Sequence, residues 1–124
     1  MMAGENPAQS AAMAAREGRL FGVQLNDGYT RLAAEDGMMF GSVHPLMALE
    51  FVHILRTTRY EGHVYFDTFP RNEDPVKEAE RNVKVFKRFW KWAGDIEKKG
   101  IGKATDNMDA MEVLRVVDKV MFKN

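Results

Sequence analysis

Two short apolar segments of the sequence each end in side chains that could bind a cation or a substrate. The segment LFGVQL runs into Asn26 and Asp27, and the segment HVYF runs into Asp67. In α/β barrels the reacting groups lie at the C-terminal ends of the strands. If both segments are strands, their ends therefore predict one functional site.

Each of these acids also has a purely structural interpretation. Asp67 could be a loop acid whose oxygens accept hydrogen bonds from nearby backbone N–H groups. Asp27 could be the turn residue of an Asn-Asp-Gly sequence, a composition that favours tight turns. Gln24, near the end of the first segment, is a further polar side chain at this strand end. The sequence alone leaves both interpretations open.

Three further candidates lie between the two segments. Glu35 and Asp36 are adjacent acids in a predicted loop over residues 26–43, and long loops in compact domains are usually functional or disordered. Carboxylate oxygens are ligands that Mg²⁺ and Mn²⁺ favour, although adjacent surface acids are often only solvated. His44 immediately precedes Pro45, where it could cap or abut a helix.

The elements that must position these residues follow from apolar spacing and from breaker residues. Strands are expected over residues 20–25 and 63–66, and helices over 8–17, 45–58, 76–98 and from a cap at Asp106 or Asn107 to 121. Two strands joined through a helix should be parallel, and parallel strands are stable almost only in a wider sheet covered on both faces. The fold class is therefore α/β, with two short parallel strands and about four helices, and it looks like a slice of a larger sheet.

The apolar spacing also predicts which helical residues face inward. For the long helix these are Val76, Ala79, Val83, Phe86, Trp90 and Ala93, and for the last helix they are Met111, Leu114, Val117 and Met121. Helical spacing separates the basic, aromatic residues 84–91 (KVFKRFWK) into a charged face and an apolar face, so a solvated outer helix explains them better than a nucleic-acid site.

Composition narrows the class of protein. The chain has 124 residues, of which 45% are hydrophobic and 29% charged, its formal net charge is zero, and it has no cysteine. A neutral chain gives no electrostatic case for nucleic acid or anionic membrane as a partner. Without cysteine, disulfides and thiolate zinc sites are excluded. We expect a soluble, cytoplasmic, single-domain protein with no targeting segment.

Two longer motifs point to a family. RLFGVQLND (residues 19–27) and MMFGSVHPLMALEFVHILRTTRYEGHVYFDTFPRNED (38–74) together resemble the last two βα units of xylose isomerase and its TIM-barrel relatives. The most specific element is YEGHVYFD (60–67), which is similar to the Tyr-x-Gly-x-x-x-Phe-Asp strand of that family. The resemblance covers about residues 2–92, and residues 93–124 are expected to form a C-terminal helical extension.

The resemblance implies a C-terminal βαβα slice of a (β/α)8 barrel from a sugar isomerase, which moves a hydride between C1 and C2 with the help of two divalent cations (Mg²⁺, Mn²⁺ or Co²⁺). Asp67 matches the strand-end carboxylate that ligates metal, and Glu35 and Asp36 fall near the metal-binding acids of the loop. Gln24 stands where the family often has a metal-binding aspartate, a loss for which Asp27 could compensate. Asn26 and His44, with Gln24, are the expected substrate-binding residues.

The resemblance also implies that this chain lacks most of a barrel. The remaining metal ligands and proton-transfer groups of the family lie on earlier strands, so residues 1–124 are expected to be one partial domain that is inactive alone. The missing strands would come from a partner or from association of identical copies. The alternative is a non-catalytic α/β module that self-associates or binds a partner through its open sheet.

Overall fold

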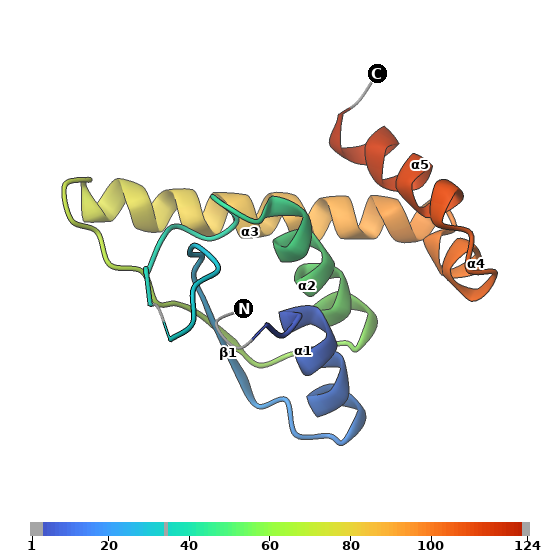
Figure 1. The fold of residues 1–124 in the computed structure, drawn as a ribbon, viewed down its shortest axis with the longest axis horizontal. Helices are drawn as coiled ribbons and strands as arrows, with labels where there is room; N and C mark the ends of the chain where they lie inside the picture. The colour runs from blue at the N-terminus through green and yellow to red at the C-terminus, as the bar shows by residue number, and fades with distance from the viewer. Residues whose placement is uncertain (1–3, 34, 123–124) are drawn as a thin grey trace.

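The computed structural model describes residues 4–33 and 35–122 of the chain. It shows a mixed α/β architecture in which two parallel strands are joined through a helix (Figure 1). In chain order the elements are α1 (Pro7–Arg16), β1 (Gly22–Leu25), α2 (Pro45–Thr57), β2 (His63–Phe66), α3 (Pro75–Lys98), α4 (Ile101–Asp106) and α5 (Ala110–Met121). The α/β class and the two short parallel strands are thus confirmed, with five helices in the described residues instead of about four.

Two helix starts follow from local sequence. The Asn6 side chain accepts a hydrogen bond from the N–H of Ala8, and the Asp74 side chain accepts from those of Val76 and Lys77. In both cases a proline occupies the first helical position, where its missing N–H is not needed. Asn6-Pro7 and Asp74-Pro75 are each typical of a cap followed by proline, so the sequence predicts both caps and the structure confirms them.

The start of the last helix was predicted wrongly. Gly100 has a φ of +85° and ends α3, but the chain then forms the short helix α4, which includes Gly102. The cap of α5 is Asp109, whose side chain accepts from the N–H of Glu112. Packing of the buried Ala104 explains this difference, because tertiary burial overrides the weak helix propensity of a single glycine.

The sheet is covered on one face only. Val23 and Leu25 of β1 are buried in a hydrophobic core that they share with α2 and α3, and Val64 and Phe66 of β2 pack against it. The alternate residues point the other way, and Tyr65 is 57% exposed. Within residues 4–33 and 35–122, no third strand pairs with either outer edge. One face and both edges of this parallel sheet are therefore open.

The inward face of α3 differs from the predicted stripe. Ala93 is buried as expected and Phe86 and Trp90 pack at the margin of the core, but Val76, Ala79 and Val83 are exposed. The buried residues of the helix are Glu78, Asn82, Val85, Phe89, Ala93, Gly94 and Ile96. Because two of these are polar, the hydrophobic pattern could not indicate this face.

The inward face of α5 is also rotated from the prediction. Val116 and Val120 are buried, and Val117 and Met121 pack against the core as expected. Met111 and Leu114, which were predicted to face inward, are exposed.

None of the helices in the described residues is long and apolar enough to cross a membrane.

Candidate functional site

The C-terminal ends of the two strands lie together at one edge of the sheet. A pocket of about 160 Å³ opens there, and four predicted site residues line it with apolar side chains of α2. These four residues are Gln24, Asn26, Asp27 and His44. The Asn26 side chain also donates a 2.9 Å hydrogen bond to the backbone carbonyl of Asp67, which ties the ends of β1 and β2 together. The structure thus brings four of the predicted residues to one pocket and the backbone of Asp67 beside them.

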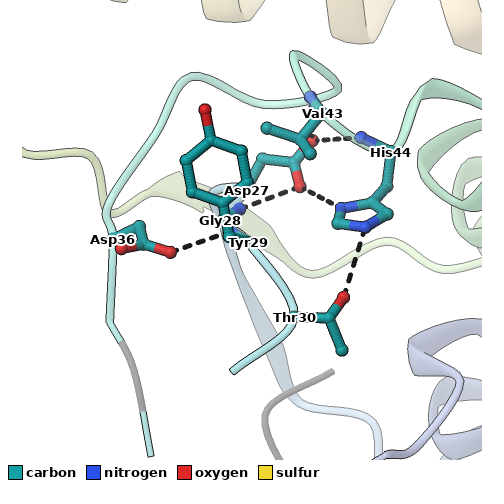
Figure 2. A network of polar contacts seen from close by, with 7 residues as sticks. All are labelled: Asp27, Gly28, Tyr29, Thr30, Asp36, Val43 and His44. Atoms are coloured by element: carbon teal, nitrogen blue, oxygen red, sulfur yellow. Dashed lines mark hydrogen bonds and ion pairs between the residues drawn. The ribbon is translucent and has the colours of Figure 1, made fainter. Parts of the chain in front are cut away.

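Asp27 is the most constrained residue of this site (Figure 2). Its Oδ2 accepts 2.9 Å hydrogen bonds from the N–H groups of Val43 and His44, and its Oδ1 accepts from the N–H of Gly28. Oδ1 also lies 2.9 Å from Nδ1 of His44. The side chain is only 2% exposed. Asp27 therefore holds the chain just before α2 against the end of β1, a larger role than that of a turn residue.

These hydrogen bonds set the charge of Asp27. Burial by itself raises the pKa of the carboxyl, but hydrogen bonds from the backbone and side chain of His44 and from the N–H groups of Val43 and Gly28 outweigh burial. The pKa of Asp27 is lowered below its ordinary value of 3.8 as a result. Asp27 is consequently an anion at neutral pH, and its charge is compensated by protein groups.

A pH dependence of stability follows from this shift. Because the folded pKa lies below the unfolded value, Asp27 contributes stability above pH 3.8 that is lost as the pH falls through the folded pKa. We expect the free energy of unfolding, measured in urea from neutral pH into the acid range, to fall more steeply for the native chain than for Asp27→Asn. Parallel curves for the two proteins would show that this carboxylate is not responsible.

His44 connects Asp27 to a hydroxyl. Its Nε2 lies 3.4 Å from Oγ1 of Thr30, so carboxylate, imidazole and hydroxyl follow one another in a row (Figure 2). If Nδ1 carries the proton that it shares with Asp27, Nε2 is an acceptor directed away from the buried acid. An imidazole fixed in this way can accept a proton or a hydrogen bond from a ligand in the pocket. Thr30 was not predicted, because no sequence spacing relates it to His44.

Asp36 and Glu35 lie apart from this row. Asp36 accepts a 2.8 Å hydrogen bond from the N–H of Tyr29 and pairs with Arg31, so it folds the loop back onto the turn after β1. Glu35 is exposed. Both oxygens of Asp27 and both of Asp36 are thus bonded to protein groups in this arrangement.

The described residues do not form a cation site by themselves. Nowhere in residues 4–33 and 35–122 do three or more His, Asp or Glu side chains gather closely enough to hold a metal ion. Metal binding by Asp67, Asp36, Glu35 and Asp27 stays a prediction, and it would need further ligands and a rearranged loop.

A second polar cluster, which the sequence did not reveal, holds the loop after each strand. Oδ1 of the buried Asn82 accepts a 2.9 Å hydrogen bond from the N–H of Phe40, and its Nδ2 donates to Oγ1 of Thr68. Thr68 also donates to the buried Glu78, and Arg81 donates to the carbonyl of Phe40. The inward polar residues of α3 thus fix the two segments that carry the candidate site.

Neither family models nor curated proteins give a match to this chain.

Proposed function

We propose that this chain is the C-terminal βαβα part of a xylose isomerase-like (β/α)8 barrel whose complete form interconverts aldose and ketose sugars. The observation that carries the proposal is the placement of Gln24 near the end of β1, and of Asn26 and Asp27 after it, beside Asp67 after β2, at one edge of a parallel sheet. This edge is where barrel enzymes bind substrate. The motifs quoted above supply the resemblance to this family.

The open sheet supports an incomplete barrel. Parallel strands are normally buried on both faces, whereas Gln24 and Tyr65 are exposed on the uncovered face of this sheet. In a closed barrel these side chains would point to the interior, and strands from elsewhere would pair with the free edges of β1 and β2. The completing strands would come from another polypeptide or from another part of a longer protein.

Within such a barrel this chain would bind and orient the sugar. The amides of Gln24 and Asn26 can both donate to and accept from sugar hydroxyls, and Nε2 of His44 can accept a proton from a hydroxyl in the pocket. The divalent cations that the resemblance implies would supply Lewis-acid polarisation of the sugar oxygens. Because the described acids do not form a cation site alone, their partners must lie on the completing strands, and the lone chain is expected to be inactive.

The proposal is tested by reconstitution. A xylose isomerase truncated before its last two βα units is mixed with this chain, and aldose–ketose isomerisation is measured over a panel of aldoses with Mg²⁺, Mn²⁺ or Co²⁺. We expect activity in the mixture and none in either component. Activity of the lone chain would contradict the incomplete-barrel interpretation, and absence of activity from a mixture that forms a stable complex would contradict the isomerase proposal.

A non-catalytic association module is the second candidate. It is favoured by the open sheet edges and by Phe21, which is exposed directly before β1. This candidate predicts that the chain binds the completing strands, or other copies of itself, with no activity under any metal condition. Both candidate functions predict that a complex forms in the reconstitution. Only the isomerase proposal predicts activity in that complex, so the measurement distinguishes them.

A further inference from the structure

An exposed stripe of four residues, apolar at its two ends and charged between them, runs along the solvent side of α5. Met111 is 77% exposed and Phe122, directly after the helix, is 64% exposed, although both are large apolar side chains. Arg115 and Asp118 lie between them and are exposed as well. The spacing of these four residues, four, three and four positions apart, places them on one helical face. Val116 and Val120 anchor the opposite side of α5 in the core.

We propose that a second copy of this chain covers this stripe, with α5 of one copy antiparallel to α5 of the other about a two-fold axis that passes between the two helices at the level of residues 116 and 117. Residues 111 and 122 are equally far from that axis, on opposite sides, as are residues 115 and 118. The two-fold operation therefore sets Met111 at the height of Phe122 of the second copy. Figure 1 shows that the chain turns back through α4, so that α5 lies alongside the C-terminal part of α3, at a distance from β1.

Charge complementarity selects both the partner and the direction. In the antiparallel arrangement Arg115 lies at the height of Asp118 of the second copy, and the symmetry creates this opposite-charge contact twice. A parallel pair would instead place Arg115 beside Arg115 and Asp118 beside Asp118, which is repulsive. The stripe is thus self-complementary in the order of its apolar and charged residues.

The contacts within one copy are compatible with this pairing. Arg115 already binds Glu112 of its own helix, so the second copy would extend this pair into a three-residue network. Exposed ion pairs contribute little affinity, and their main effect is on direction. The apolar surface continues beyond the stripe, because Leu114 also borders an apolar groove between α2 and α5. A helix pair of this length is a small interface, so we expect a dissociation constant of about 10–100 µM.

Cysteine cross-linking tests the geometry. The native chain has no cysteine, so Met111→Cys with Phe122→Cys places two thiols where the two-fold pairing brings them together. We expect a short bis-maleimide to convert this double variant to a covalent dimer. Met111→Cys alone should give little dimer, because the two copies of residue 111 would be about 16 Å apart along the helix. Efficient cross-linking of the single variant, or none of the double variant, would overturn the antiparallel pairing.

Sedimentation over concentrations that span the expected dissociation constant, up to about 500 µM, tests the interface without cross-linking. We expect Met111→Glu to weaken the dimer about tenfold or more, whereas Met13→Glu, at an exposed methionine of α1, should leave it unchanged. Arg115→Asp and Asp118→Arg should each weaken the dimer. The double variant with both exchanges should have a dissociation constant within about threefold of that of the native chain. A chain that stays monomeric, or a combined exchange without recovery, would contradict the proposal. This result is independent of isomerase activity.

Discussion

Replacement of Asp27 by alanine is expected to lower the free energy of unfolding by about 3–5 kcal/mol. The carboxylate is buried and accepts hydrogen bonds from the N–H groups of Gly28, Val43 and His44. Alanine would leave these donors without their acceptor, and it would remove the partner of the His44 ring. The corner before α2 would therefore lose its attachment to β1.

Urea unfolding of matched variants measures this effect. Glu35→Ala removes an exposed acid from the same loop, and we expect it to change the free energy of unfolding by less than about 0.5 kcal/mol. Asp27→Asn keeps the shape of the side chain without its charge. Its loss of unfolding free energy should lie between those of Asp27→Ala and Glu35→Ala. If Asp27→Ala were as stable as Glu35→Ala, the proposed anchoring role of this carboxylate would be wrong.

Leu55→Ala should have the second large effect. Leu55 of α2 is fully buried in the core that joins the helices to the covered face of the sheet. Truncation of a buried leucine removes its apolar contacts and leaves a cavity, so we expect a loss of about 3–4 kcal/mol of unfolding free energy.

Leu46 provides a matched control on the same helix. It is 58% exposed, and Leu46→Ala should lower the free energy of unfolding by less than about 1 kcal/mol. Thermal or urea unfolding of the two variants measures the difference. Equal losses at the two positions would mean that the core is not centred where α2 meets the sheet.

The sequence predicted the parts of the fold that local chemistry determines. Asn6 with Pro7 and Asp74 with Pro75 encode two helix starts, because a cap and a proline need no distant partner. The alternation of strand and helix predicted the parallel pair, which the structure confirms. Gln24, Asn26 and Asp27 were expected at the strand ends, and they line one pocket with His44, while their role as site residues stays a prediction.

The parts that were missed depend on contacts between distant segments. Asn82 is buried because it binds Phe40, 42 positions earlier in the chain, and no periodicity of apolar residues can indicate such a bond. The long-range acceptor role of Asp27 at Val43 and His44 was hidden in the same way. The rotation of α5 also depends on how α3 and α4 present their surfaces. The lack of a matching family or curated protein leaves isomerase chemistry as a proposal.

The central claim is that the two strand ends supply part of a sugar site that other strands complete. Its most direct test is the reconstituted mixture with Asp67→Asn in place of the native chain. Asp67 follows β2 at the edge where the barrel would bind its ligands, whereas Glu73 is exposed in the loop before α3. We expect Asp67→Asn to lower the isomerase activity of the mixture at least about a hundredfold while the complex still forms. A mixture with Glu73→Gln should retain the isomerase activity. Full activity with Asp67→Asn, or equal losses from both variants, would contradict this account.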